Sequence, residues 1–421
     1  MKCLVIEGNH KLKGTIEVSG AKNSAVALIP ASILADDVVT IDNIPNISDI
    51  DSLTEILEYL GAKVTREKNQ MKIDPRGIIN KEIPKEISSK LRASYYFMSA
   101  LFGKYKTAHM YFPGGCSIGA RPIDQTLKAF ECLGAKVVEQ DNKFDIEAEQ
   151  IKGSKIYLDC PSVGATINGI LASVLAEGVT EIENAAKEPE IVNVATFLNT
   201  MGANIKGAGT SHIKIIGTDH LKGCYHEVIP DRIEAGTYII AGALLGDPLK
   251  VSGIIPEHVE SLLTKLKESG IPLEVGEDYV IVSHTPNMKP ISVKTLGYPG
   301  FPTDLQQPLT VLLTQMKGKS TLRETIYENR FQNVRYLNEM GAKINVKDSQ
   351  NIEIKGPTKL EGCFVEATDL RAGACMILAG LCADGVTTIS KIEHVLRGYE
   401  NITGKFTNVG AKIEIKEIEL K

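Results

Sequence analysis

The sequence predicts a two-domain α/β protein in which one unit of about 70 residues is repeated six times, three times in each domain. Three features predict this fold: a glycine that recurs at a nearly fixed interval, an amphipathic helix before each of these glycines, and a more apolar helix earlier in each unit. The glycines stand 73, 68, 68, 71 and 69 residues apart, so six units account for all 421 residues. They are Gly61, Gly134, Gly202, Gly270, Gly341 and Gly410.

Each of these landmark glycines is predicted to end one helix and to precede two strands. Leu53, Ile56 and Leu60 stand before Gly61 at the spacing of one helical face. Glycine suits the position after a helix because that position favours a left-handed backbone. Alternating apolar and polar residues over 343–354, interrupted by a turn, predict the two strands.

The earlier helix of each unit is apolar on every side. A strand resembling Gly-Val-Thr follows it, as at 384–389, so the unit reads strand–helix–strand–helix–strand–strand. Helices this apolar are expected to be buried, which predicts three units packed around central helices with the sheets outside. The expected central helices include 24–34, 93–102, 165–176, 233–245 and 372–381.

A single core of 421 residues would exceed the usual size of a domain. We therefore predict an N-terminal three-unit domain over residues 22–229. The C-terminal three-unit domain is expected to comprise residues 1–21 together with 230–421, because the strand 3–6 is needed to complete the sixth unit.

Composition limits the class of function. The net charge of −5 and the pI of about 6.0 argue against a nucleic-acid partner, which a basic surface would favour. The longest apolar stretches, 238–245 and 374–382, are too short to span a membrane, and residues 1–14 lack the apolar core of a signal peptide. Eight cysteines without a Cys-x-x-Cys pair predict a reduced, cytoplasmic protein with no structural metal.

Positive side chains recur at the starts of the apolar helices. Helix starts carry free N–H groups and the positive end of the helix dipole, so a cation is unfavourable there unless an anion is bound. Any one of these cations could be surface decoration, and Asp304 could be a plain helix cap. The near-equivalent positions in the six units are Lys22, Arg92, Ser162-Val163-Gly164, Arg232, Asp304 and Arg371.

The segment 113–122 carries a cysteine in an unusual loop. It contains three glycines and two prolines in ten residues, which predicts a special backbone path. Cys116 lies near Arg121, and a cation beside a loop cysteine can lower the pKa of its thiol and make it a nucleophile or an acid. The alternative is an inert thiol, which we expect for the other seven cysteines.

At these positions the chain resembles the enolpyruvyl transferase family, and most closely the branch that acts in peptidoglycan synthesis. That family folds as an inside-out α/β barrel of two three-unit domains. Asp124-Gln125 and Gln306-Gln307-Pro308 resemble the second of two paralogues found in some Gram-positive bacteria. The matching motifs are Ser19-Gly20-Ala21-Lys22-Asn23, Leu91-Arg92-Ala93-Ser94, Pro113-Gly114-Gly115-Cys116 with Arg121-Pro122, Pro161-Ser162-Val163-Gly164-Ala165-Thr166, Asp231-Arg232-Ile233-Glu234, Tyr298-Pro299-Gly300-Phe301-Pro302-Thr303-Asp304, Glu328-Asn329-Arg330-Phe331, Thr368-Asp369-Leu370-Arg371-Ala372 and Arg397-Gly398-Tyr399-Glu400.

The resemblance implies a transferase that moves enolpyruvate from phosphoenolpyruvate to the 3′-hydroxyl of UDP-N-acetylglucosamine and releases phosphate, in the first committed step of peptidoglycan synthesis. It implies that Cys116 donates a proton to the enol carbon and can hold a covalent adduct, and that Asp304 is the general base. It further implies no cofactor and no metal, a role in cell shape and cell division, and sensitivity to fosfomycin.

The same resemblance implies the substrate contacts. Lys22, Arg121 and Arg397 are expected to bind phosphoenolpyruvate, with Arg92 and Arg371 around the same anionic subsite. The remaining expected substrate-binding residues are Asn23, Pro122, Ile123, Asp124, Gln125, Ser162, Val163, Gly164, Arg232, Asp304 and Ile326. One departure is Thr126, where the family commonly has His, and this puts a nucleotide contact from that side chain in doubt.

Three alternatives stay open on the sequence. The shikimate-pathway relative has the same fold and also uses phosphoenolpyruvate, but it lacks the loop 113–122. A sliding clamp also has six repeats, but its positive residues line a ring instead of gathering at helix starts. A catalytically silent paralogue would not be expected to keep Lys22, Cys116, Asp304 and Arg397 together.

Overall fold

The computed structural model describes residues 1–111 and 123–418. Contacts between these residues divide the chain into two compact units, each treated by itself below. The C-terminal unit contains residues 1–19 together with 230–418, and the N-terminal unit contains 20–111 together with 123–229. The sequence placed the two boundaries after residues 21 and 229.

The N-terminal unit has three apolar helices and three sheets. The apolar helices begin within two residues of their predicted starts, and α4 contacts both α1 and α6. Its helices are α1 (Lys22–Ala31) with the 3-10 turn η1 (Ser32–Leu34), α2 (Ser48–Leu60), η2 (Pro75–Gly77), α3 (Lys85–Ser88), η3 (Arg92–Ser94), α4 (Tyr95–Tyr105), α5 (Asp124–Cys132), α6 (Val163–Ser173) and α7 (Pro189–Thr200). Its strands are β3 (Val39–Asp42), β4 (Lys63–Glu67), β5 (Gln70–Asp74), β6 (Thr107–Tyr111), β7 (Lys136–Gln140), β8 (Lys143–Glu147), β9 (Lys155–Tyr157), β10 (Val179–Glu183), β11 (Asn204–Lys206), β12 (His212–Ile216) and β13 (Tyr225–Glu227).

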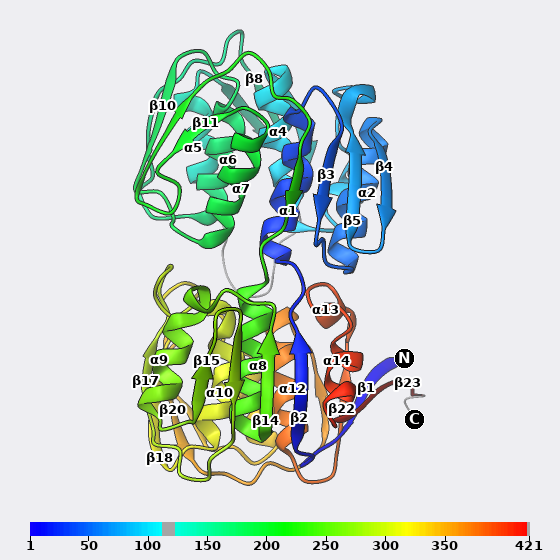
Figure 1. Cartoon of the computed structure of the whole chain (residues 1–421). Coiled ribbons are helices and arrows are strands. Elements are labelled where there is room, and N and C mark those ends of the chain that lie inside the picture. Colours follow the sequence, from blue (N-terminus) through cyan, green and yellow to red (C-terminus); the bar gives the residue numbers. More distant parts are fainter. Residues whose placement is uncertain (112–122, 419–421) are drawn as a thin grey trace. The chain divides into compact units, whose positions relative to one another are not determined.

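The C-terminal unit repeats this plan, and Figure 1 shows α8, α10 and α12 lying together with strands around them. Helix α10 contacts both α8 and α12. The helices are α8 (Arg232–Leu245), η4 (Pro256–Val259), α9 (Glu260–Glu268), η5 (Thr303–Leu305), α10 (Gln306–Thr314), α11 (Asn333–Glu339), α12 (Leu370–Cys382), α13 (Glu393–Leu396) and α14 (Ile402–Asn408). The strands are β1 (Lys2–Glu7), β2 (Leu12–Glu17), β14 (Gly246–Ser252), β15 (Leu273–Val275), β16 (Tyr279–Val282), β17 (Ser292–Lys294), β18 (Gly318–Arg323), β19 (Ile344–Val346), β20 (Asn351–Gly356), β21 (Phe364–Glu366), β22 (Val386–Ser390) and β23 (Lys412–Glu417).

Six sheets among the described residues correspond to the six predicted units. Five have four strands, in the orders β13-β3-β5-β4, β11-β12-β10-β9, β15-β16-β14-β2, β17-β18-β20-β19 and β21-β22-β1-β23, and the sixth has the order β6-β8-β7. In the last sheet of the chain, β1 pairs antiparallel with both β22 and β23. The N-terminal strand therefore completes the sixth unit, as the sequence predicted.

Two of the six repeats, those that contain α1 and α8, exchange their leading strands. The repeat pattern did not predict this exchange. In a regular unit, the strand before the apolar helix pairs in parallel with the strand after it, as β17 does with β18. Strand β2 precedes α1 but pairs in parallel with β14, whereas β13 precedes α8 but pairs in parallel with β3. Each leading strand is thus left in the unit from which the chain departs, and the segments after β2 and β13 carry the chain from one unit to the other.

The landmark glycines all have the predicted backbone. Their φ angles run from 82° at Gly270 to 110° at Gly202, a left-handed region in which residues with a Cβ are strained.

Each of the two compact units has its own buried hydrophobic cluster, and the two clusters share no residue. No helix among residues 1–111 and 123–418 is long and apolar enough to span a lipid bilayer.

Candidate active site

The two helix starts with cationic side chains in the C-terminal unit are capped by their preceding aspartates. The Asp231 carboxylate accepts from the amides of Ile233 (2.8 Å) and Glu234 (2.9 Å) at the start of α8. Asp369 accepts in the same way from the amides of Arg371 (2.8 Å) and Ala372 (3.0 Å) at the start of α12. Arg232 and Arg371 therefore follow residues that cap their helices.

Asp304 is not a helix cap, so this alternative interpretation of the sequence is wrong. It lies inside the turn η5, whose cap position is occupied by Pro302 without a side-chain hydrogen bond. Its carboxylate instead accepts from two arginines. Arg330 Nη2 lies 2.8 Å from Oδ1, and Arg371 Nη2 lies 3.1 Å from Oδ2. Asp304 is thus the shared anionic partner of two cations.

Burial of this cluster is uneven. Arg330 and Arg371 have only 3% and 5% of their side chains exposed, whereas 27% of the Asp304 side chain is exposed. Burial by itself would raise the pKa of the Asp304 carboxyl, but the charges of Arg371 and Arg330, the hydrogen bond from Arg330 and the charge of Arg232 together hold that pKa well below its usual value. Asp304 is therefore ionised at any working pH.

A carboxylate in this state is a poor proton acceptor, because each oxygen already binds a guanidinium. It becomes a better base only when one of these cations moves away. Arg371 is held on its other side by the Tyr399 hydroxyl, to which Nη1 donates at 3.1 Å, and that hydroxyl lies 2.9 Å from Thr237 Oγ1. The cluster can therefore exchange its contacts: an incoming anion at Arg371 would compete with Asp304 for the same guanidinium.

The N-terminal unit shows a similar built-in counter-ion. Lys22 is the first residue of α1, and its Nζ lies 2.7 Å from Asp49 Oδ2. Both side chains are largely buried, with 14% of Lys22 and 3% of Asp49 exposed. The unfavourable charge at this helix start is therefore balanced by a carboxylate of α2. Asn23, the next predicted site residue, is half-buried in the same first turn.

The start of α5 is tied to the segment before α6. Gln125 donates to Asp159 Oδ2 (2.9 Å) and accepts from the Asp159 amide (2.7 Å), and it also donates to Asp124 Oδ2 (3.0 Å). Ser162 caps α6 by accepting from the Ala165 amide at 3.2 Å. Thr126 is 2% exposed and so belongs to the core, which leaves Asp124 and Gln125 as the polar surface of this helix start.

Gly164 permits a close approach that no larger residue would allow. A Cβ at this position would lie 1.9 Å from the Tyr95 hydroxyl oxygen, far inside van der Waals contact. We expect Gly164→Ala to destabilise the protein by about 1–3 kcal/mol through this overpacking, against the usual gain from replacing a helical glycine. Thermal melting of Gly164→Ala, Tyr95→Phe and the double variant measures this loss of stability. Because Phe lacks the clashing oxygen, the double variant should lose much less stability than the two single variants lose together. Strictly additive losses would refute the clash.

The remaining predicted site residues are distributed as follows. Arg92 is half-buried in η3, Arg397 is half-buried just after α13, Ile123 is buried before α5, and Ile326 is 42% exposed after β18. Arg232 lies with its guanidinium carbon 5.7 Å from the centre of the Tyr298 ring. Cys116, Arg121 and Pro122 lie outside the described residues.

Sequence reasoning assigned no role to Arg330 or to Thr303, whose hydroxyl accepts from Arg330 Nη1 at 2.7 Å. Arg330 stands in the motif Glu328-Asn329-Arg330-Phe331, and Thr303 directly precedes Asp304, so both had been noticed as part of a resemblance. A charge count over helix starts could not find Arg330, because it lies in the loop before α11 and not at the start of an apolar helix.

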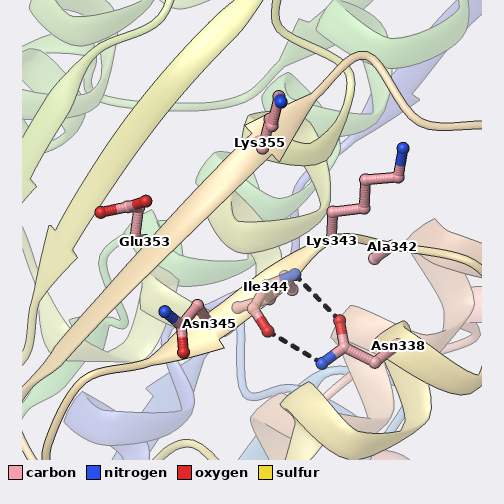
Figure 2. Close-up of a pocket in the computed structure, with 7 residues that line it drawn as sticks. All are labelled: Asn338, Ala342, Lys343, Ile344, Asn345, Glu353 and Lys355. Atoms are coloured by element: carbon pink, nitrogen blue, oxygen red, sulfur yellow. Dashed lines mark hydrogen bonds between the residues drawn. The ribbon is translucent and has the colours of Figure 1, made fainter.

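Two hollows in the C-terminal unit lie away from these residues. One, of 310 Å³, is lined by residues around β19 and β20, and Figure 2 shows there the two hydrogen bonds between the Asn338 side chain and the backbone of Ile344. The other, of 360 Å³, is lined by residues of β17, β18 and β20 together with Lys347. Neither includes a predicted site residue. Within the described ranges, no three His, Cys, Asp or Glu side chains gather as a metal site.

Comparison with known proteins places the chain in a family. Residues 6–406 match the family model of EPSP synthase (3-phosphoshikimate 1-carboxyvinyltransferase). The chain is 53% identical to UDP-N-acetylglucosamine 1-carboxyvinyltransferase 2 of Bacillus subtilis (strain 168) over 98% of this chain and 96% of that protein. It is 50% identical to the protein of the same name in Listeria monocytogenes, over 97% of each chain.

Solved structures agree in fold. The enolpyruvyl transferase NikO from Streptomyces tendae superposes with a TM-score of 0.89 at 26% identity over 98% of both chains. EPSP synthase from Acinetobacter baumannii superposes with a TM-score of 0.76 at 19% identity, over 99% of this chain and 100% of the other. The predicted fold of two three-unit domains is thereby confirmed. On this family match, and on its near full-length identity with the curated relatives, the chain belongs to the enolpyruvyl transferase family, within the branch of the UDP-N-acetylglucosamine 1-carboxyvinyltransferases.

Proposed function

We propose that this chain transfers the enolpyruvyl group of phosphoenolpyruvate to the 3′-hydroxyl of UDP-N-acetylglucosamine and releases phosphate, the first committed step of peptidoglycan synthesis. The observation that carries this proposal is the identity of 50–53% over nearly the whole chain with relatives that bear this activity in their names. Both substrates are metabolites of the cytoplasm, which is where we place the reaction.

The reaction needs one proton donor and one proton acceptor. In the proposed mechanism Cys116 donates a proton to the methylene carbon of phosphoenolpyruvate while Asp304 accepts the proton of the sugar hydroxyl, so that the hydroxyl oxygen bonds to the enol carbon. The Cys116 thiolate then takes a proton back from the new methyl group while the bond between the former enol carbon and the phosphate oxygen breaks, which releases phosphate and completes the transfer. Lys22, Arg92, Arg121, Arg371 and Arg397 hold the two anionic groups of phosphoenolpyruvate.

The ion pairs of Asp304 bear on this mechanism. Arg371 donates to Asp304 and is also assigned to phosphoenolpyruvate, so a bound phosphoenolpyruvate anion would compete with Asp304 for this guanidinium. Loss of this contact removes a positive charge from Asp304 and so raises the pKa of its carboxyl towards the usual value. The base is therefore strengthened at the moment when the acceptor hydroxyl has to be deprotonated.

The sugar nucleotide is assigned to the polar helix starts and to one turn. Asp124 and Gln125 of α5, the capped start of α6 at Ser162-Val163-Gly164, and Asn23 of α1 offer donors and acceptors for the diphosphate and sugar. Ile123, Pro122 and Ile326 provide apolar contacts, and Arg232 adds a positive charge near Asp304.

Phosphate release from phosphoenolpyruvate tests the proposal. It is measured with UDP-N-acetylglucosamine as acceptor, and separately with shikimate 3-phosphate, the acceptor implied by the name of the matching family model. We expect stoichiometric release with UDP-N-acetylglucosamine and none above background with shikimate 3-phosphate. Release with shikimate 3-phosphate alone would assign the chain to the other branch of the family.

A further inference from the structure

Glu324 is a fully buried carboxylate for which the proposed reaction has no direct use. It follows β18 directly, and none of its surface is exposed. Its Oε1 accepts from the Thr295 hydroxyl (2.9 Å) and from the amides of Ile326 (2.8 Å) and Tyr327 (3.3 Å). Its Oε2 accepts from the Thr303 hydroxyl at 2.8 Å. A buried carboxylate is costly unless its oxygens are satisfied in this way, so its placement calls for an explanation.

The Thr303 hydroxyl connects Glu324 to Arg330 by two hydrogen bonds. A hydroxyl has one proton to donate and two lone pairs with which to accept. The Thr303 hydroxyl donates its proton to Glu324 Oε2 at 2.8 Å. A lone pair of the same oxygen then faces Arg330, whose Nη1 donates to it at 2.7 Å.

Arg330 in turn connects Thr303 to Asp304. The guanidinium group is planar and rigid, so fixing Nη1 on Thr303 also fixes the direction of Nη2, which donates to Asp304 Oδ1 at 2.8 Å. The side chain is 3% exposed, and its Nε has no hydrogen-bond partner among the described residues. Its position therefore depends on Thr303, Asp304 and the Tyr327 ring, whose centre is 5.0 Å from the guanidinium carbon.

The other oxygen of Glu324 orders the turn that exposes Ile326, a residue assigned above to the nucleotide. We propose that Glu324, acting through Thr303 and Arg330, is a positioning residue that couples the turn at Ile326 to the orientation of the base Asp304. One buried carboxylate then sets both the place where the nucleotide is read and the direction in which the base points. This inference rests on the proposed function of Asp304 and Ile326.

Removal of the Thr303 hydroxyl tests the coupling between Glu324 and Asp304. It leaves the hydrogen bonds of Glu324 to the turn at Ile326 in place. Thr303→Val keeps the shape of the side chain but has no oxygen for Glu324 or Arg330. We expect kcat to fall by about 10–100-fold, because small displacements of a catalytic group are costly. The KM for UDP-N-acetylglucosamine should stay within about 3-fold, because the contacts of Glu324 with the amides of Ile326 and Tyr327 remain. Thr303→Ser restores the hydroxyl and should recover most of kcat.

The double variant distinguishes a chain of contacts from general damage. In Glu324→Gln, an amide nitrogen in place of Oε2 leaves the Thr303 proton without its acceptor. If both residues act through one relay, Thr303→Val with Glu324→Gln should lose little more kcat than the worse single variant. Thr314→Val is the matched control, since it also removes a buried hydroxyl of this unit, one that donates to the Val311 carbonyl at the end of α10.

The outcomes separate this inference from the proposed function. A wild-type protein inactive with phosphoenolpyruvate and UDP-N-acetylglucosamine would overturn the function itself. With an active wild type, the coupling is refuted if Thr303→Val retains its kcat, if Thr314→Val loses as much, or if the losses of Thr303→Val and Glu324→Gln multiply. A selective loss of kcat that Ser rescues, with no further loss in the double variant, supports it.

Discussion

Cys116→Asp is expected to retain turnover and to lose inactivation by fosfomycin, whereas Cys116→Ala is expected to lose both. Aspartate can still donate a proton to phosphoenolpyruvate, but its oxygen is a much weaker nucleophile towards an epoxide than a thiolate is. Fosfomycin is a small anionic epoxide, so the cations proposed to bind phosphoenolpyruvate should direct it to Cys116. With the general acid removed, turnover of Cys116→Ala should fall by about 10²–10⁴-fold.

The other cysteines supply the controls for this experiment. Burial raises the pKa of the Cys375 and Cys382 thiols to about 12 and that of Cys224 to about 11, so these three hold almost no thiolate at neutral pH. Cys160 is exposed and should react with neutral thiol reagents. Its modification therefore shows how an accessible thiol reacts when no cluster of cations directs an anionic reagent to it.

The readout is intact mass followed by peptide mapping after treatment with fosfomycin in the presence of UDP-N-acetylglucosamine. We expect one adduct, on Cys116, while iodoacetamide should also modify Cys160. A Cys160→Ser variant should show the same single fosfomycin adduct as the wild type. An adduct on Cys160, or an unmodified Cys116, would contradict the assignment of Cys116 as the guided nucleophile.

Asp304→Ala is expected to lose both activity and stability. Removal of the proposed base should lower kcat by about 10²–10⁴-fold while the affinity for UDP-N-acetylglucosamine changes much less. The sequence alone left two interpretations of Asp304, a catalytic base or a helix cap. Loss of a helix cap would lower the free energy of unfolding by about 1 kcal/mol. The structure changes this expectation, because loss of Asp304 leaves Arg330 and Arg371 buried without their shared anion. We expect a cost of about 3 kcal/mol, at the low end for buried ion pairs because 27% of Asp304 is exposed.

The pH dependence of this stability difference provides a further check. The folded-state pKa of the Asp304 carboxyl is depressed, so its stabilising contribution is fully present above the ordinary aspartate pKa of about 3.9 and is lost as the pH falls towards the folded-state value. Urea unfolding of wild type and Asp304→Ala at neutral and acidic pH measures the difference. It should be constant near neutrality and shrink only in strong acid. An Asp304→Ala protein that is inactive but fully stable would mean that the two arginines find other partners.

Much of the fold could be predicted because the repeat leaves local signals. Glycines at a nearly constant interval mark helix ends, and all six adopt the expected positive φ. The exchange of β2 and β13 could not be predicted in this way. A strand has the same alternating pattern whichever parallel neighbour it joins, so nothing within 12–17 or 225–227 distinguishes β14 from β3 as the partner.

The candidate site was predictable in its charges but not in its pairing. Cations at matched helix starts made Lys22, Arg232 and Arg371 candidate site residues, because position along a repeat can be counted. Their counter-ions could not be counted. Asp49 lies one helix away from Lys22 along the chain, and Arg330 reaches Asp304 from the loop before α11. Such contacts arise from packing between elements, which a single sequence does not display.

The measurement that tests the central claim most directly follows the oxygen that bridges carbon and phosphorus in phosphoenolpyruvate. If the enolpyruvyl group is transferred, the bond between this oxygen and the enol carbon breaks, and a new bond forms from that carbon to the 3′-oxygen of UDP-N-acetylglucosamine. Phosphoenolpyruvate with heavy oxygen at the bridge should therefore release all of the label in phosphate and yield an unlabelled enolpyruvyl ether of UDP-N-acetylglucosamine. Label retained in pyruvate, with UDP-N-acetylglucosamine unchanged, would contradict the account.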